Sequence, residues 1–176
     1  MTMQVSIRPA TAADIPAITR IYAHAVRYGT ASFELEPPDE AEMRRRQRAL
    51  LDGGYPYIVA DGGGTILGYA YAGPFRPRPA YRHSVEDSVY VVQEAQRRGI
   101  GRVLLDALIV RCTEAGFRQM IAVIGDSTMQ AASISLHAAA GFRTVGTLDA
   151  VGYKHERWLD SVYMQRPLGA GAEMPP

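Results

Sequence analysis

The feature that most constrains the fold is a basic turn with two glycines, placed between a strand-like and a helix-like segment. Residues 88–92 (SVYVV) have the composition of a buried strand, residues 96–101 are QRRGIG, and residues 102–116 have helical character. Glycines let a ligand approach the backbone, and the first N–H groups of a helix have no partners within it. The helix dipole makes this end positive, so the turn is predicted to bind phosphate oxygens. Three arginines surround it: Arg97, Arg98 and Arg102.

Two common glycine motifs do not match this turn. A dinucleotide-binding fingerprint needs a third glycine and an acidic residue about twenty positions later, whereas only Gly99 and Gly101 are present. An ATP-binding loop needs a lysine directly after its glycines, and here that residue is Arg102. A basic turn that merely begins a surface helix is the alternative interpretation.

Size and charge limit the classes of protein to consider. The chain has 176 residues, of which 47% are hydrophobic and 21% charged, which fits one globular domain. With 19 basic against 18 acidic residues, net charge gives no reason to expect nucleic acid or a membrane as a partner. The arginine-rich stretch 44–48 is interleaved with glutamates just before it and fits a solvated helix face.

The single cysteine and the few histidines are also informative. Cys112 excludes an internal disulfide and favours a reducing compartment, and its place on an apolar helix face fits the core better than a nucleophile. No segment has the length of a membrane span, and the N-terminus lacks the pattern of a signal peptide. We therefore expect a cytoplasmic protein. Because His24, His83 and His155 lack ligand-like spacing, we expect no metal.

Hydrophobic periodicity and turn signals predict an α+β domain with the order β-α-α-β-β-β-α-β-α-β-β. The expected segments are a strand ending at Pro9, helices after Thr11 and Asp39, strands 57–60, 66–71 and 85–92, helix 102–116, strand 120–124, helix 131–140, and strands around Val145 and over 158–166. We expect a mixed, mostly antiparallel central sheet of about seven strands, flanked by four helices, with one parallel crossover between the fourth and fifth strands. The domain is expected to span residues 1–168, and residues 169–176 to form a flexible tail.

Two motifs resemble those of the GNAT acyltransferases, which bind acetyl-coenzyme A. The turn resembles their Q/R-x-x-G-x-G/A pyrophosphate loop, and residues 133–142 resemble the S-x-x-L-[YH]-x-x-x-GF segment. The resemblance extends over residues 4–168 and implies the GNAT fold with acetyl-coenzyme A as cosubstrate. It implies that the cofactor is bound by Val89, Tyr90, Val91, Gln96, Arg97, Arg98, Gly99, Ile100, Gly101, Arg102, Gln130 and Ser133. At Gln130 the chain departs from the pattern, because many relatives carry asparagine there.

Five further blocks look like the phosphinothricin and methionine-sulfoximine N-acetyltransferases: residues 30–34, 75–82, 85–86, 88–91, and 152–154 with 158–160. The resemblance implies acetyl transfer to the amino group of a small amino acid analogue, which is a detoxifying reaction. It implies substrate contacts from Phe33, Arg76, Arg78, Tyr81 and Glu86. It also implies a homodimer, for which aromatic residues of the last strands either line the interface or fill the monomer's core: Tyr153, Trp158 and Tyr163.

The chemistry of these residues is consistent with that activity. Acetyl transfer requires deprotonation of an amine, and Glu86 is the candidate general base; a plain surface glutamate is the alternative, and Asp87 is the next candidate. His137 occupies the position of a family tyrosine that protonates the departing sulfur, so it is a candidate acid or a structural histidine. Arg76 and Arg78 suit the carboxylate and phosphinate of the analogues, or they are surface arginines stiffened by neighbouring prolines.

Other functions remain open at this level. Another small amine or a protein N-terminus would use the same machinery, and a non-catalytic acetyl-coenzyme A sensor would use the same fold. The physiological substrate is not encoded in a fold or a cofactor loop.

Overall fold

The computed structural model describes residues 5–176, which fold as one α+β unit. The strands are β1 (Ser6–Pro9), β2 (Tyr57–Asp61), β3 (Ile66–Pro74), β4 (Ser84–Val91), β5 (Gln119–Gly125), β6 (Arg143–Lys154) and β7 (Arg157–Pro167). The helices are α1 (Ile15–Tyr28), α2 (Glu40–Asp52), α3 (Ile100–Glu114) and α4 (Ala131–Ala139), with short 3-10 turns at Ala12–Asp14, Pro79–Tyr81 and Gln93–Ala95.

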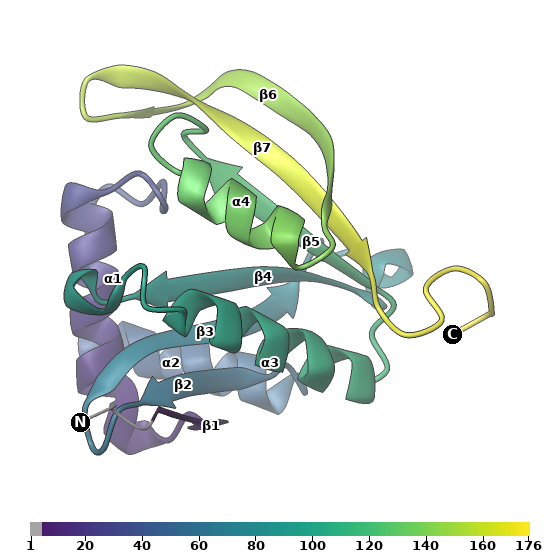
Figure 1. Cartoon of the computed structure of the whole chain (residues 1–176), viewed down its shortest axis with the longest axis horizontal. Coiled ribbons are helices and arrows are strands. Elements are labelled where there is room, and N and C mark those ends of the chain that lie inside the picture. The colour runs from purple at the N-terminus through teal and green to yellow at the C-terminus, as the bar shows by residue number, and fades with distance from the viewer. Residues whose placement is uncertain (1–4) are drawn as a thin grey trace.

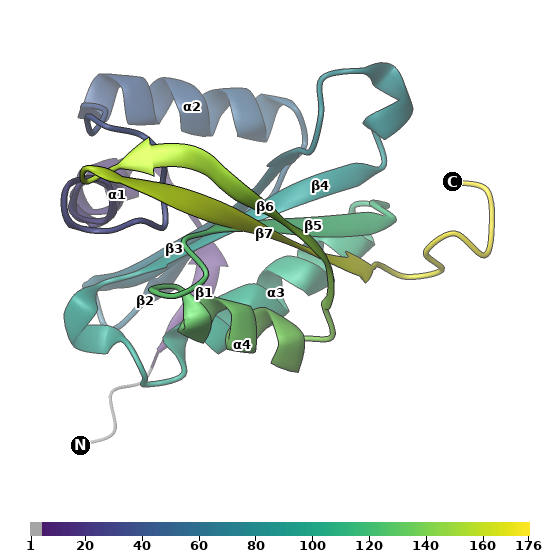
Figure 2. The same ribbon diagram turned by 90° about the horizontal axis from the view of Figure 1, so that it is seen from above.

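The strands form one seven-stranded sheet in the order β1-β2-β3-β4-β5-β7-β6. All neighbours are antiparallel except β4 and β5, which run parallel. Helices α1 and α2 cover one face of the sheet, whereas α3 and α4 cover the other (Figures 1 and 2). The predicted element order, the mixed sheet and its single parallel crossover are confirmed.

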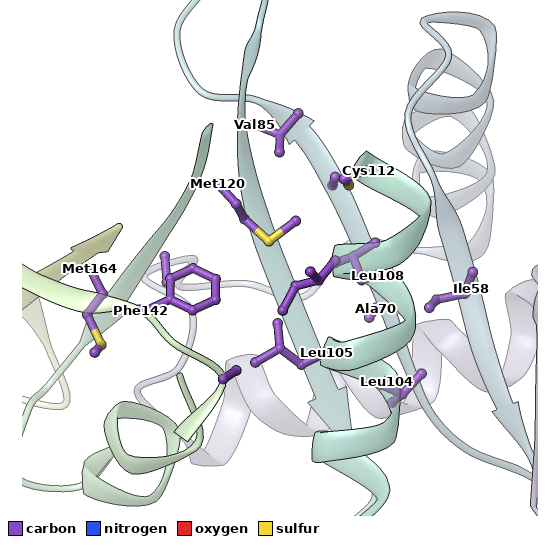
Figure 3. Packing of buried hydrophobic residues seen from close by; sticks show 14 of the residues in the cluster. Ile58, Ala70, Val85, Leu104, Leu105, Leu108, Cys112, Met120, Phe142 and Met164 are labelled. Carbon is purple, nitrogen blue, oxygen red and sulfur yellow. The ribbon is translucent and has the colours of Figure 1, made fainter. Parts of the chain in front are cut away.

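Each face of the sheet has its own hydrophobic core. Helix α3 buries Leu104, Leu105, Leu108 and Cys112 against the sheet (Figure 3). On the opposite face, apolar residues of α1 and α2 pack on a layer of tyrosines from β2, β3 and β4. Alternating side chains of β4 therefore enter two different environments, which matters for the chemistry below.

Local sequence signals account for most boundaries. Thr11 and Asp14 form a capping box, and Asp39 caps α2 by accepting from the Glu42 backbone N–H at 2.8 Å. Helix α3 ends before Gly116, whose φ of 86° requires the left-handed region that glycine favours.

The last hairpin differs most from expectation. We expected a short strand around Val145, but β6 runs for 12 residues. A register shift between Leu148 and Gly152 interrupts its pairing with β7, and Ala150 lies there at φ 51°. Residues 149–151 of β6 stand opposite Asp160 alone. Such an irregularity is hard to recognise in a sequence because it depends on how two strands pair.

The C-terminal residues 169–176 form turns, and Arg118 donates to the Pro175 carbonyl at 3.2 Å. Their flexibility, and the domain boundary at residue 168, stay predictions. Within residues 5–176, no helix combines the length and apolar character required to cross a bilayer.

Candidate functional site

A cavity opens where β4 and β5 separate. The two strands pair only from Ser84 to Glu86, which lie opposite Gln119 to Ile121. Beyond this point they diverge, and a cavity of about 550 Å³ lies between residues 87–91 of β4 and residues 122–125 of β5. Helix α4 and the turn before α3 complete its walls. A volume of this size fits a cofactor or a substantial part of one.

The turn at one end of this cavity is built to receive an anion. Arg97 has φ 58° and Gly99 has φ 83°, and such left-handed residues turn successive backbone N–H groups toward one side. Among the described residues, no side chain caps the N-terminus of α3. The first N–H groups of this helix are therefore free for a ligand, and the helix dipole favours a negatively charged one.

Most predicted cofactor residues line this cavity. The exceptions are Arg98, which is exposed, and Ile100, whose side chain is buried in the core. Arg102 lines the cavity while its guanidinium donates to Asp106 at 2.6 Å and to the Ala139 carbonyl at 3.1 Å. Gln130 also lines it and donates to the Thr30 hydroxyl at 3.4 Å. Binding by these residues stays a prediction.

Sequence reasoning missed the wall opposite β4. Residues 122–125 of β5 line the cavity, but the apolar run 120–124 indicated only a buried strand. Nothing in that run shows that its pairing with β4 ends at Ile121. Leu136 of α4 and Ala31 of the loop after α1 were missed for the same reason, because they reach the cavity only through the tertiary fold.

Glu86 lies across β4 from the cavity. Its neighbours Val85 and Asp87 are buried toward α3 and α4, so Glu86 points to the α1 and α2 face. It is half-buried, and burial raises the pKa of its carboxyl above the ordinary value. The charge of Asp87 adds to this effect, while Arg76 opposes it. A carboxylate with a raised pKa is suited to accept a proton near neutral pH.

His137 is buried at the cavity wall, with both ring nitrogens engaged. Its Nε2 lies 2.9 Å from Oδ2 of Asp87, and its Nδ1 lies 2.7 Å from the carbonyl oxygen of Ser133. Burial by itself would lower the pKa of the imidazole, but the hydrogen bond and charge of Asp87 outweigh burial and raise it. The role of His137 as an acid stays a prediction, and in this arrangement its nitrogens face Asp87 and Ser133.

The loop after α1 is fastened over the end of β5. The ring of Phe33 lies against the backbone of Gly125 and of Gly152, where a methyl group on either glycine would overlap it. Lys154 is 4% exposed and donates to the Ser32 carbonyl at 2.6 Å, and burial lowers the pKa of its amine. Phe33 is thus a wedge between two strands, and its expected contact with a substrate stays a prediction.

The other predicted substrate residues lie in the exposed loop between β3 and β4. Arg76 stacks over the Phe75 ring at 5.1 Å, and Tyr81 contacts that ring edge-on at 5.7 Å. Arg78 precedes the 3-10 turn that contains Tyr81. Of the two arginines, only Arg76 influences the titration of Glu86. The structure therefore brings Arg76 toward Glu86, whereas Arg78 and Tyr81 are exposed on the loop.

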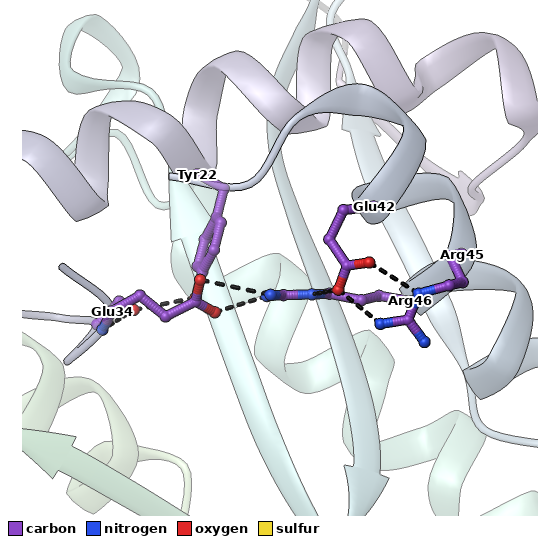
Figure 4. A network of polar contacts seen from close by, with 6 residues as sticks. Tyr22, Glu34, Glu42, Arg45 and Arg46 are labelled. Atoms are coloured by element: carbon purple, nitrogen blue, oxygen red, sulfur yellow. Dashed lines mark hydrogen bonds and ion pairs between the residues drawn. The ribbon is translucent and has the colours of Figure 1, made fainter. Parts of the chain in front are cut away.

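A polar network connects α2 to α1 and to the loop that follows α1, on the face of the sheet to which Glu86 points (Figure 4). Glu34 accepts from the Tyr22 hydroxyl at 2.9 Å and from Arg46 at 2.5 Å. Arg46 in turn donates to Glu42, which also binds Arg45. These opposite charges balance one another. Beside them lies a second cavity of about 290 Å³, lined mainly by tyrosines and by apolar residues of α2.

Within residues 5–176, no group of three or more histidine, cysteine or acidic side chains is arranged to hold a metal ion. The two faces of β4 hold an uncapped helix N-terminus, a half-buried carboxylate and a buried histidine–aspartate pair.

Comparison with known proteins agrees with this arrangement. The family model described as an acetyltransferase (GNAT) domain matches residues 7–163. A phosphinothricin N-acetyltransferase of Alcaligenes faecalis is 57% identical over 158 residues, which cover 90% of this chain and 80% of that protein. An L-methionine sulfoximine/L-methionine sulfone acetyltransferase of Pseudomonas aeruginosa is 42% identical, with 94% and 96% covered.

A solved structure is also similar along almost the whole chain. It is a phosphinothricin acetyltransferase from Sinorhizobium meliloti in complex with acetyl-coenzyme A, with a TM-score of 0.95, 51% identity, and coverage of 99% of this chain and 94% of that one. These matches extend over both motifs and over the divergent strands. The chain belongs to the GNAT acetyltransferases.

Proposed function

We propose that this enzyme transfers the acetyl group of acetyl-coenzyme A to the amino group of a small amino acid analogue of the phosphinothricin, methionine sulfoximine or methionine sulfone type. The observation that carries the proposal is the arrangement around β4. An anion-binding cavity lies on one side of the strand and a half-buried carboxylate, Glu86, on the other. The named activities of the similar proteins supply the substrate class. The reaction would detoxify such analogues in the cytoplasm.

The cavity fits acetyl-coenzyme A by the chemistry of its donors. The uncapped N-terminus of α3 and the left-handed turn offer backbone N–H groups to the pyrophosphate. Gly101 faces the cavity, and a methyl group there would lie 3.4 Å from Leu136. The exposed backbone of residues 87–91 suits the amide groups of the pantetheine arm, which would lie along it as an added strand.

Glu86 accepts the proton of the substrate ammonium in this proposal. Acetyl-coenzyme A supplies an activated thioester, which a neutral amine attacks. The amine nitrogen bonds to the carbonyl carbon, the carbon–sulfur bond breaks, and the thiolate leaves with the electron pair. The nitrogen then loses its second proton to become an amide, and this proton balances the one that the thiolate takes up to become coenzyme A. A backbone N–H at the open edge of β4 stabilises the oxygen that gains charge. Glu86 keeps the amine neutral, and its raised pKa suits this exchange near neutral pH.

The acceptor lies on the Glu86 side of the strand. Arg76 provides a guanidinium for a carboxylate or phosphinate, and Phe33, whose ring lies against Gly125 at the end of β5, would offer an apolar surface to the side chain of the acceptor. The roles of Arg78 and Tyr81 rest on the resemblance, because both are exposed in the single chain. His137 is the candidate acid for the thiolate, acting through its buried pair with Asp87.

Thiol release measured with a panel of amines tests the proposal. The purified protein would be mixed with acetyl-coenzyme A and phosphinothricin, methionine sulfoximine, methionine sulfone, glutamate or an alanine-starting peptide. Mass spectrometry would identify each product. We expect N-acetylation of the three analogues with the greatest kcat/KM. Preference for the peptide would indicate an N-terminal acetyltransferase, and binding without turnover on any amine would indicate a sensor.

We propose further that the protein is a homodimer joined through the last hairpin. β6 ends the sheet, and large apolar residues of the hairpin are about half or more exposed: Val145, Leu148, Val151, Tyr153 and Trp158. Clusters of this kind mark protein interfaces. Light scattering should give twice the mass of the chain, and Trp158→Glu should shift the equilibrium to monomer. A monomeric mass for the unmodified protein at micromolar concentration would contradict the proposal.

A further inference from the structure

Asp87 occupies the closed end of the cofactor cavity. Glu86 and Ile121 form the last parallel pair, and Asp87 is the first residue of β4 beyond it. Its side chain is 1% exposed and belongs to the cavity wall together with Val89 and Val91. Val91 lies four positions further along the strand, a span of about 13 Å. Asp87 therefore lies at the end of the cavity opposite the anion-binding turn.

Helix α4 places one fully buried side chain at this end of the cavity, besides Ile134 and Leu136, which pack partly buried against the core. It forms one wall of the cavity with Ala132, Ser133 and Leu136. His137 is the only buried residue within α4, at 4% exposure. The hydrogen bond between His137 and Asp87 is thus the buried polar contact that joins this wall to β4.

The contacts of His137 specify where a proton lies. A carboxylate oxygen of Asp87 and the carbonyl oxygen of Ser133 are both acceptors, yet they face the two ring nitrogens at 2.9 and 2.7 Å. A neutral imidazole has one N–H and can donate to only one of them. One proton must therefore lie between Oδ2 and Nε2, on either atom. Among residues 5–176, Oδ1 of Asp87 has no partner, so the buried carboxyl relies on this contact.

We propose that Asp87 is a positioning residue, and that the proton it shares with His137 holds α4 against the bound cofactor. Once the pair loses a proton, the neutral imidazole has a single N–H for two acceptors. One of its nitrogens then faces an oxygen of Asp87 or Ser133 with no proton between them, and that buried contact becomes repulsive. Helix α4 would then loosen and the cavity would lose its fixed wall. The inference rests on the proposed binding of acetyl-coenzyme A in this cavity.

The proposal gives cofactor affinity a defined pH dependence. Because the pKa of His137 is raised in the folded protein from its ordinary value of 6.5, the contribution of the pair is complete below that ordinary value. It is lost as pH rises through that raised value. On α3, burial and then the charge of Asp87 raise the pKa of Cys112 to about 12. Arg102 and Arg166 donate to the carbonyls at the end of α4.

Asp87→Asn removes the titrating proton of the pair but keeps the geometry of its hydrogen bonds. The asparagine amide can donate to a neutral Nε2 while Nδ1–H stays on the Ser133 carbonyl, so both hydrogen bonds persist without a titrating proton. The dissociation constant of acetyl-coenzyme A, whose sulfur carries no titrating proton, would be measured by calorimetry from pH 6 to 9.5. We expect the affinity of the unmodified protein to fall roughly tenfold over the alkaline part of this range. The curve for Asp87→Asn should be flat there.

Two further variants complete the test. Asp52→Asn, which removes an exposed carboxylate at the end of α2, should follow the unmodified protein. His137→Gln also lacks the shared proton and should be flat, so it replaces Asp87→Asn if that variant does not fold. A flat curve for the unmodified protein, or an unchanged alkaline loss in Asp87→Asn or its replacement, would overturn the inference. Failure of the unmodified protein to bind acetyl-coenzyme A at any pH would instead refute the proposed function.

Discussion

Gly125→Ala should destabilise the protein through the ring of Phe33. A Cβ atom on Gly125 would lie 2.8 Å from Cζ of Phe33 and closer still to Cε1, with the Thr30 carbonyl oxygen 3.1 Å away. Ordinary van der Waals contact begins at 3.4 Å. Neither the backbone oxygen nor the ring, which Gly152 confines from the other side, can give way freely. Overpacking of this kind costs about 1–3 kcal/mol.

Gly146→Ala is the matched control, since a Cβ atom on that β6 residue would meet no described atom within 4 Å. Urea unfolding at a fixed protein concentration would follow both variants. We expect the free energy of unfolding to fall by about 2 kcal/mol for Gly125→Ala and to change little, or rise by about 0.5 kcal/mol, for Gly146→Ala.

A double-mutant cycle with Phe33→Ala identifies the cause. If the ring is responsible, Gly125→Ala should destabilise the Phe33→Ala protein much less than the parent, which leaves a coupling of about 1 kcal/mol or more. Equal effects of the two glycine substitutions, or a coupling energy near zero, would show that contact with the Phe33 ring is not the cause of the destabilisation.

Three other outcomes are expected. Glu86→Gln should lower kcat about 10²–10⁴-fold and leave the affinity for acetyl-coenzyme A unchanged. It should also remove the acidic limb that the raised pKa of Glu86 gives to the pH–rate profile. Near-full turnover of the variant at neutral pH would exclude Glu86 as the base. Gly101→Asp adds a negative charge at the start of α3 and should therefore abolish the binding of acetyl-coenzyme A, as measured by calorimetry. A folded variant with normal affinity would show that the turn does not bind the pyrophosphate. Arg8 lowers the pKa of Asp14 to about 2 from 3.8, so this pair stabilises the fold above pH 3.8 and loses its effect as pH falls toward 2. Asp14→Asn should flatten that part of the stability curve measured by acid unfolding, and an unchanged curve would contradict this origin.

The sequence determined the features that depend on neighbours along the chain. The basic glycine turn requires a backbone that glycine can adopt and a helix that begins directly after it, and both lie within a few residues. Caps at Thr11 and Asp39, and the apolar periodicity of α3, are equally local. Alternation along β4 was sufficient to separate Glu86 from Asp87. These patterns specified the order of elements and one end of the candidate site.

The tertiary structure decided what depends on residues far apart in the chain. That β4 and β5 separate after a single short stretch of pairing is a property of two strands and cannot be read from either one. The contact between Asp87 and His137 joins residues 50 positions apart, and the wedge of Phe33 requires glycines on two distant strands. Local propensity carries no information on such contacts, because they arise only when the sheet and helices pack. The sequence thus determined which chemical groups are available, and packing decided which of them meet.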